Sequence, residues 1–539
     1  MGANVIKGFH PPTVCANGMV ATPHYLATLT GVRVLMDGGN AVDAAVAANA
    51  VLGVVEPHMC GVGGDLFALV YLPRRGVLLG LNASGRAPRA LTVDRLRSLG
   101  YERMPRHGAL AATVPGAVDG WTELLARAGT RGLDELLQPA IELAERGAPV
   151  TRRLAERLAS SEPLLRQFPS TADAFLPGGR VPREGDLLRL PELAATLRLL
   201  ASDGRDAFYR GPIAQAIAET SARLGGAITA HDLADHRSEW VEPLSTTYRG
   251  YDVYQLPPNS QGLTVLLELN LAEGFDLAAW PHNSAEVIHT LVEIKKLAFA
   301  DRDRYLGDPS FVEVPIAPLL DKEYAARRRR LVDPQRAAED AGAGRLASGD
   351  TVYLCAADRD GNIVSLIQSL YYAFGSGVVV EGTGILLHNR GAYFTFEEGH
   401  PNRLQPGKRP LHTLTPGLVG RGGRPFMAIG TRGGDGQPQT VLQVLVNMLD
   451  YGLDPQAAVA APRWIHGGVT LDDERDTLTV EEDVPAEVRE ELVRRGHRLA
   501  VVPSMSASMG SAMVVRVDEE RGVFWGAADP RSHGLALGW

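Results

Sequence analysis

The sequence predicts an α+β sandwich, in which strands pack between layers of helices. Two stretches of different pattern support this fold class. From about residue 120 to 350 the apolar residues recur mainly at helical spacing, whereas after residue 350 the chain consists of short strand-like runs such as TVYLCAA and SAMVVRV. With 539 residues the chain is long enough for several ordinary domains or for one large fused core.

Composition argues against several classes of function. The net charge of −9 at pH 7 disfavours a nucleic-acid partner, because phosphate binding requires a basic face. The three cysteines are too few for a disulfide scaffold and lack zinc-ligand spacing. We find no secretory signal and no apolar run long enough to span a bilayer. We therefore expect a cytoplasmic protein with no membrane and no nucleic-acid partner.

Helical patterns dominate the first part of the chain. After a strand-like GMVAT, the Ala-rich stretch Ala41–Ala50 predicts a tightly packed core helix. Leu133–Glu145 and Ser284–Leu306 have helical patterns as well. The stretch Ala337–Gly349 has almost no large apolar residues, so we expect it to be exposed, mobile and a natural place for a cut.

A β-hairpin is predicted next. Two strand-like runs, TVYLCAA and IVSLIQSL, flank the turn Asp358-Arg-Asp-Gly-Asn362, and a turn centred on Asp360 places Ser369 opposite Thr351. A neighbouring hydroxyl can polarise the Oγ of Thr351, although such cross-strand pairs are also common for structural reasons alone. The turn resembles the start of a calcium loop but lacks the closing Glu, so we expect no metal here.

The segment Gly430-Thr-Arg-Gly-Gly-Asp435 lies between a strand-like MAIGT and a predicted helix, Gln437–Leu449. Two consecutive glycines before a helix can direct backbone N–H groups at a developing oxyanion. An ordinary strand-to-helix turn explains the same residues equally well. Pro485–Arg495 predicts one further helix, and DTLTV and SAMVVRV predict strands.

A series of motifs then extends through most of the chain. It comprises GGNAVDAAVA (38–47), VPGAVDGW (114–121), LPPNSQGL (256–263), AFADRDRYLGDPSF (298–311), PGKRPLHTLTP (406–416), GTRGGDGQPQ (430–439) and GAADPR (526–531). In content and order these motifs resemble the γ-glutamyltransferase (glutathione hydrolase) family nearly from end to end.

The resemblance implies a four-layer αββα sandwich made as one proenzyme without a cofactor. The proenzyme would cut itself between Asp350 and Thr351 into a large subunit, 1–350, and a small subunit, 351–539. These would remain together as a heterodimer, with further dimerisation left open. Thr351 occupies the position of the family nucleophile, and Ser369 that of the supporting hydroxyl. The oxyanion-hole glycines match Gly433 and Gly434, and Asn389 falls in a stretch beside the pocket.

The chemistry of this assignment is coherent. A hydroxyl is a poor nucleophile until a base takes its proton. Cleavage before Thr351 creates an α-amine, a group whose ordinary pKa is roughly 7.7–8.0. That amine can act as the general base near neutral pH.

The specificity positions depart from the family pattern. Ser84 stands where typical members have the Arg that binds the substrate α-carboxylate, and Arg86 is shifted by two residues. Tyr371 and Tyr393 replace the side chains that hold the α-ammonium. His412 and Thr413 replace a pair of serines.

A small-molecule amide remains the expected substrate. A buried ammonium without a partner costs several kcal/mol, whereas Arg86, Arg390 and Arg432 are available to pair with a carboxylate. We therefore expect an acyl group that carries a carboxylate but no α-amine, of the glutaryl or oxamate type. A true γ-glutamyltransferase and an uncleaved, non-catalytic binding protein of the same fold are the alternatives.

Overall fold

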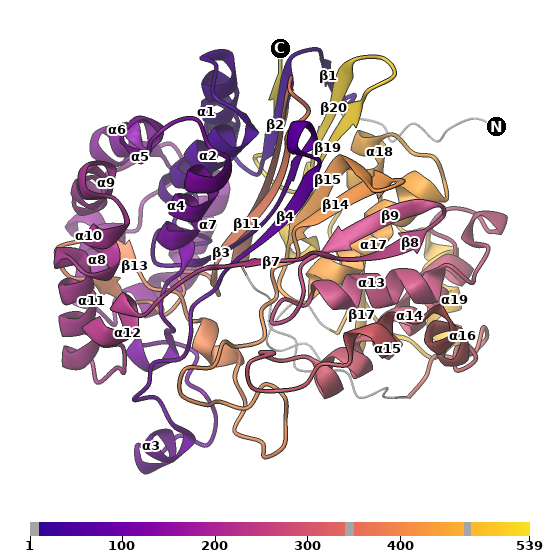
Figure 1. Ribbon diagram of the computed structural model, residues 1–539. Coiled ribbons are helices and arrows are strands. Elements are labelled where there is room, and N and C mark those ends of the chain that lie inside the picture. Colours follow the sequence, from indigo (N-terminus) through magenta and orange to yellow (C-terminus); the bar gives the residue numbers. More distant parts are fainter. Residues whose placement is uncertain (1–9, 340–349, 468–475) are drawn as a thin grey trace.

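The computed structural model describes residues 10–339, 350–467 and 476–539. Two seven-stranded sheets lie face to face between two helical layers (Figure 1). The first sheet has the order β21-β2-β10-β11-β3-β4-β7 and the second the order β1-β20-β19-β15-β14-β9-β8. The predicted αββα sandwich is therefore confirmed.

The strands of the first sheet are β2 (Gly18–Thr22), β3 (Asp65–Leu72), β4 (Val77–Ala83), β7 (Glu239–Val241), β10 (Asp350–Asp358), β11 (Ile363–Tyr371) and β21 (Leu535–Gly538). Those of the second are β1 (Thr13–Cys15), β8 (Leu244–Tyr248), β9 (Tyr251–Gln255), β14 (Gly417–Arg421), β15 (Arg424–Arg432), β19 (Ser511–Asp518) and β20 (Val523–Ala528). A smaller sheet joins β16 (Trp464–His466), β17 (Thr477–Glu481) and β18 (Arg498–Val502).

One helical layer covers the first sheet (Figure 1). Its main members are α1 (Tyr25–Met36), α2 (Ala41–Val55), α4 (Ala117–Ala128), α5 (Leu133–Leu136), α6 (Gln138–Arg146), α7 (Arg152–Leu165), α9 (Pro191–Asp203) and α11 (Pro212–Arg223). The opposite layer contains α13 (Gly262–Ala272), α14 (Ala285–Tyr305), α16 (Lys322–Arg329), α17 (Gly436–Leu449), α18 (Pro455–Ala460) and α19 (Ala486–Arg494).

Strand β10 is buried on both faces, which explains its unbroken run of apolar residues. Val352 and Leu354 pack toward the first helical layer, whereas Tyr353 and Cys355 pack toward the second sheet. Successive side chains of a strand point to opposite faces, so a strand between two layers needs apolar residues at every position. This burial fixes the start of β10 in the centre of the molecule.

Most predicted helices are present. The Ala-rich stretch forms α2, whose first turn is closed by a capping box between Asn40 and Asp43. The predicted helix Ser284–Leu306 forms α14, and the Ser284 side chain caps it by accepting from the Val287 N–H. The single helix predicted over Leu133–Glu145 is instead two helices, because Leu137 ends α5 and Pro139 belongs to the first turn of α6.

The broad helical expectation for residues 120–350 was wrong over 239–255, which forms β7, β8 and β9. The alternating, aromatic-rich runs LSTTY and YDVYQ around Arg249-Gly250 are typical of a hairpin. These strands complete both sheets at one edge.

Both sheets combine strands from 1–350 with strands from 351–539, so the two predicted subunit regions share one folded body. Of the stretch expected to be mobile, only Ala337–Glu339 is described, and residues 340–349 lie outside the described residues. Asp350 is already the first residue of β10.

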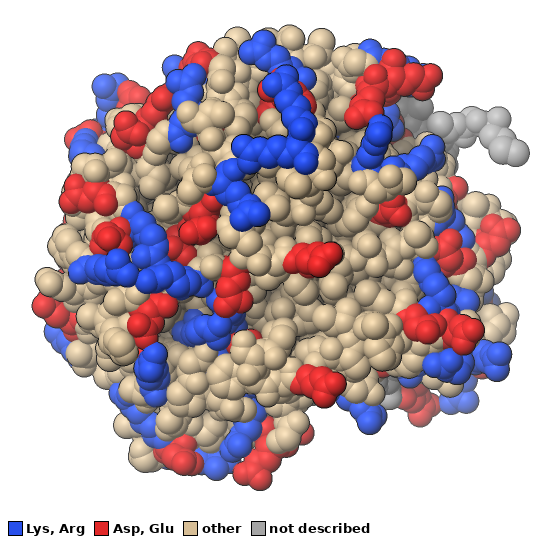
Figure 2. Space-filling view, viewed as in Figure 1, with Lys and Arg blue, Asp and Glu red and all other residues tan. Residues whose placement is uncertain are grey.

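Acidic and basic side chains are interspersed over the face seen in Figure 2. Within the described ranges, no helix combines the length and apolar character needed to cross a membrane.

A buried histidine pair joins the two subunit regions. Nδ1 of His289 in α14 lies 2.8 Å from Nε2 of His497. Nε2 of His289 donates to the Asp333 carbonyl. Glu293 lies close enough to complete a possible metal-ligand cluster. However, its carboxylate pairs with Lys296 at 2.8 Å, so the polar atoms of this cluster already have protein partners.

We expect stability to fall in mild acid. Burial, followed by the charges of Lys296 and His289, lowers the pKa of His497 to about 3 from its ordinary 6.5. His412 and His466 have pKa values of about 3 for similar reasons. A lowered folded-state pKa gives stability that is complete above 6.5 and is lost as the pH falls toward 3. Urea unfolding between pH 8 and pH 4.5 checks this, and a rising midpoint on acidification would contradict it.

Candidate active site

Thr351 and Ser369 lie side by side where β10 begins. The strands pair with Thr351 opposite Ser369, which confirms the predicted register. The Oγ of Thr351 donates to the Oγ of Ser369 over 3.0 Å, and both side chains are buried. The backbone N–H of Tyr371 also donates to Ser369 Oγ at 2.8 Å. Ser369 thus accepts from two donors, one of which is the threonine hydroxyl.

The backbone around this pair is irregular. A bulge separates Asp350 from Thr351, and Tyr371, which pairs with Asp350, has a φ of 80°. The Gly-rich turn before β3 packs directly on β11, since a Cβ on Gly64 would lie 2.6 Å from the Ser369 carbonyl oxygen. Glycine is therefore required at position 64 because the two backbones approach closely.

The predicted glycine turn leads from β15 into α17. Gly433 has a φ of 125° and Gly434 a φ of 55°, conformations that favour glycine. Within the described part of the chain, no acceptor pairs with the backbone N–H of either glycine. Gln261 fixes the turn from α13 by donating to the Gly434 carbonyl at 3.0 Å. The turn therefore offers free donors at a helix N-terminus.

A buried arginine stacks on Tyr371, two residues after Ser369. The guanidinium of Arg390 stacks 4.0 Å above the Tyr371 ring and donates to Thr413 Oγ1 at 3.1 Å. Its side chain is buried, and Nη2 has no hydrogen-bond partner. No carboxylate of the described residues is within ion-pair distance, and Asp65 and Asp435 act on it only at longer range. Burial lowers the pKa of Arg390, but guanidinium stays charged.

Tyr393 connects this arginine site to the glycine turn. Its ring packs edge-on against Tyr371 at 5.6 Å, and its hydroxyl donates to Asp435 at 2.8 Å. Asp435 follows the two glycines and pairs with the buried Arg302 of α14 at 2.7 Å. Burial raises the pKa of Asp435, and Arg302 opposes that rise.

His412 contacts Asp65 of β3 and lies near enough to Arg390 to be affected by its charge. Its Nε2 is 3.1 Å from Asp65, a buried carboxylate that also accepts from the N–H groups of Gly85 and Gly116. A carboxylate only accepts, so Nε2 carries the proton and Nδ1 is left as an acceptor without a partner. Burial and then Arg390 lower the pKa of His412 to about 3, so its ring is neutral near pH 7.

Four predicted binding residues have other engagements. The hydroxyl of Ser84 donates to Asn82 at 2.7 Å. Arg86 is partly exposed and pairs with Glu239 and Asp308. Two more predicted residues bind backbone groups of neighbouring loops: the side chain of Asn389 donates to the Arg106 carbonyl, and that of Arg432 to the Ala507 carbonyl.

Three side chains of this arrangement were not singled out from the sequence. They are Asp65 in GVGGD, Gln261 in LPPNSQGL and Arg302 in AFADRDRY. Their sequence surroundings did not reveal which distant groups these buried charged and amide side chains would pair with.

The fold and this arrangement define a hydrolase of the N-terminal-nucleophile class. The chain belongs to the gamma-glutamyltranspeptidase family, whose sequence model matches residues 27–539. The prediction of an enzyme of this family is therefore confirmed.

The chain is 44% identical over 521 residues to the glutathione hydrolase-like YwrD proenzyme of Bacillus subtilis (strain 168), covering 96% of this chain and 98% of that protein. It is 39% identical to the oxamate amidohydrolase proenzyme of Klebsiella pneumoniae, with 98% and 100% covered. The crystal structure of cephalosporin acylase from Bacillus halodurans superimposes with a TM-score of 0.92 at 40% identity, covering 100% of this chain and 98% of that one.

Proposed function

We propose that this protein is a self-processing amidohydrolase that uses Thr351 to cleave amides of an acyl group carrying a carboxylate and no α-amine. The observation that carries the substrate class is the buried guanidinium of Arg390, which lacks an ion-pair partner among the described residues. A buried charge without a counter-ion is costly, so an anionic substrate group would be strongly favoured there.

Self-cleavage is the first step of the proposal. The Thr351 hydroxyl attacks the Asp350 carbonyl carbon, the peptide C–N bond breaks, and the departing nitrogen takes the hydroxyl proton. Water then hydrolyses the resulting ester, leaving a carboxylate on Asp350 and a free α-amine on Thr351. The hydrogen bond from Thr351 to Ser369 supports this step, because it holds the nucleophile at the end of a buried strand.

Substrate cleavage repeats the same chemistry. The new α-amine takes the proton from Thr351 Oγ, which attacks the substrate carbonyl, and the amine of the substrate leaves with that proton. The N–H groups of Gly433 and Gly434 stabilise the oxyanion. Water releases the acyl group by hydrolysis, and an acceptor amine would release it by transfer.

The binding residues divide between the two ends of the acyl group. Arg390 and Thr413 hold the carboxylate, and Tyr371 and Tyr393 form the wall beside it. His412 offers an acceptor nitrogen, Nδ1, that has no partner among the described residues. Ser84, Arg86 and Asn389 act through neighbouring backbone and side chains rather than on the substrate.

This proposal predicts a clear order of substrates. Glutaryl-p-nitroanilide or oxamate should be cleaved with a kcat/KM at least ~10²-fold above that of γ-glutamyl-p-nitroanilide. The reason is that the α-ammonium of the γ-glutamyl compound is desolvated on binding without gaining an ion-pair partner. Butyryl-p-nitroanilide, which has no carboxylate, is the control and should also be slow. A preference for the γ-glutamyl compound would overturn the substrate class.

Glutathione hydrolysis and γ-glutamyl transfer form the second candidate function. One observation favours it: Oδ2 of the buried Asp435 has no hydrogen-bond partner and could accept from an ammonium. The name of the relative from Bacillus subtilis points the same way. Arg302 already neutralises Asp435, which is why we place this function second. Turnover of glutathione in the presence of an acceptor dipeptide distinguishes the two.

A further inference from the structure

The glycine turn rests on another loop of the chain, Ser506–Ser511, which we term the bracket loop. Strands β15 and β19 pair up to Arg432 and Ser511, so Gly433 leaves the sheet beside Gly510. A Cβ on Gly510 would lie 2.9 Å from the Arg432 carbonyl oxygen, and one on Gly433 would lie 3.7 Å from the Gly510 Cα. The two backbones therefore touch with no side chain between them.

One buried hydroxyl joins the turn to the bracket loop. Thr431 Oγ1 donates to the Arg432 carbonyl at 2.9 Å and accepts from the Ser511 N–H at 3.1 Å. The side chain is fully buried, so water cannot replace either bond. Thr431 thus fixes the backbone immediately before the two glycines.

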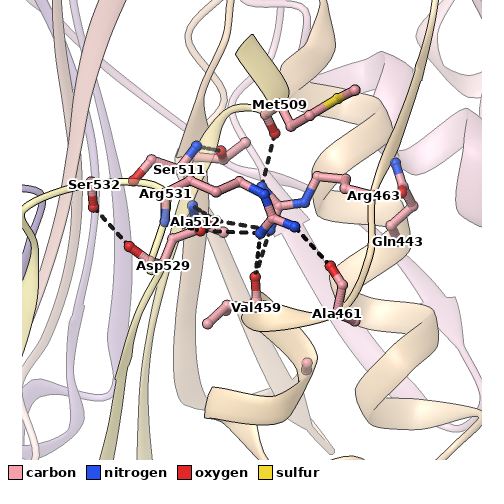
Figure 3. A network of polar contacts seen from close by, with 12 residues as sticks. Gln443, Val459, Ala461, Arg463, Met509, Ser511, Ala512, Asp529, Arg531 and Ser532 are labelled. Atoms are coloured by element: carbon pink, nitrogen blue, oxygen red, sulfur yellow. Dashed lines mark hydrogen bonds and ion pairs between the residues drawn. The ribbon is translucent and has the colours of Figure 1, made fainter. Parts of the chain in front are cut away.

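A network of buried charged side chains binds the backbone of the bracket loop (Figure 3). Arg463 donates to the Met509 carbonyl at 2.8 Å, and Asp529 accepts from the Ala512 N–H at 2.9 Å. Glu481 accepts from the Ser506 N–H at 3.2 Å. The loop is therefore anchored at its start, near its middle and just beyond its end.

The charges of this network balance one another. Arg463 pairs with Asp529 at 2.8 Å, Arg531 pairs with Asp529 at 3.1 Å, and Arg531 also pairs with Glu481. All four side chains are buried. Burying four charges costs desolvation energy that such pairs recover only when every hydrogen bond is made. A network that is fully satisfied only in one geometry holds the backbone around it in that geometry.

We propose that the bracket loop sets the position of the oxyanion-binding turn, with Thr431 and Arg463 as positioning residues. This inference rests on the proposed role of Gly433 and Gly434. Oxyanion donors must lie about 2.7–3.1 Å from the developing charge. A shift of the turn would therefore weaken binding of the transition state while leaving ground-state binding at Arg390 intact.

The test compares two substitutions at one position. Thr431→Val keeps the volume and removes both hydrogen bonds, whereas Thr431→Ser keeps the hydroxyl. Thr479→Val is the matched control, because that buried hydroxyl on β17 has no hydrogen-bond partner. Each variant is assayed with glutaryl-p-nitroanilide for kcat and KM, and for inhibition by glutarate and by a boronic acid analogue of the acyl group.

Thr431→Val should lower kcat ~10- to 100-fold, somewhat less than deleting an oxyanion donor outright. KM and glutarate inhibition should stay within about twofold of wild type, and boronate inhibition should weaken in step with kcat. Thr431→Ser and Thr479→Val should behave like wild type. Equal kcat values for the two Thr431 variants would overturn the inference, as would a parallel loss of glutarate binding. Thr351→Ala tests the proposed function separately, because it removes the nucleophile and leaves the bracket loop unchanged. Retained activity in that variant would count against the proposed function and not against the role of the bracket loop.

Discussion

Replacing Thr351 with alanine is expected to leave one unbroken chain of 539 residues with no measurable amidase activity. The variant lacks the hydroxyl that attacks the Asp350 carbonyl and, later, the substrate. Loss of a catalytic nucleophile costs on the order of 10⁴- to 10⁶-fold in kcat. Intact-mass analysis and an amide hydrolysis assay measure both effects on one preparation.

Thr351→Ser is the control for this change. It retains a hydroxyl at the same position and should still be cleaved and active, at a reduced rate. Thermal unfolding should show both variants folded, since the side chain is small and the strand is buried on both faces. Cleavage of Thr351→Ala at the wild-type rate would place the nucleophile elsewhere.

Replacing Arg390 with methionine should lower kcat/KM on carboxylate-bearing substrates by roughly 30- to 5,000-fold, the equivalent of about 2–5 kcal/mol for one partner of a buried charge pair. The same variant should be as stable as wild type or more stable, because it removes a buried cation that has no ion-pair partner in the described structure. Steady-state kinetics and thermal unfolding together measure the opposed effects.

Arg86→Met is the matched control for Arg390. Its guanidinium already pairs with Glu239 and Asp308 near the surface, so the substrate preference should not change. Arg390→Lys keeps the charge but not the planar fork, and we expect an intermediate rate. If Arg86→Met abolished the preference for a carboxylate while Arg390→Met did not, Arg86 and not Arg390 would be the residue that binds the substrate carboxylate.

The centre of the site could be predicted from sequence because it is local. Thr351 and Ser369 are joined by one hairpin, and the turn between them fixes their register. The two glycines likewise lie between a strand and a helix that are adjacent in sequence. In both cases short-range patterns were enough to predict the local geometry, whereas the roles of these residues were inferred from the family resemblance.

The rest of the site depends on contacts between distant segments. Nothing in the sequence shows that Arg390 lacks an ion-pair partner among the described residues or that Arg86 has two, because Glu239 and Asp308 lie far along the chain. Gln261, at the N-cap of α13, and Arg302 of α14 reach the glycine turn from more than a hundred residues away. The arrangement of the candidate binding residues therefore depends on tertiary packing that periodicity and motif order do not encode.

Activity, as we propose it, requires a free α-amine on Thr351. The most direct measurement follows freshly made wild-type protein over time, recording its intact mass and its rate of amide hydrolysis on the same samples. We predict that fragments 1–350 and 351–539 appear together and that activity rises in proportion to them. A preparation that stays one continuous polypeptide and still hydrolyses amides at the full rate would contradict the claim.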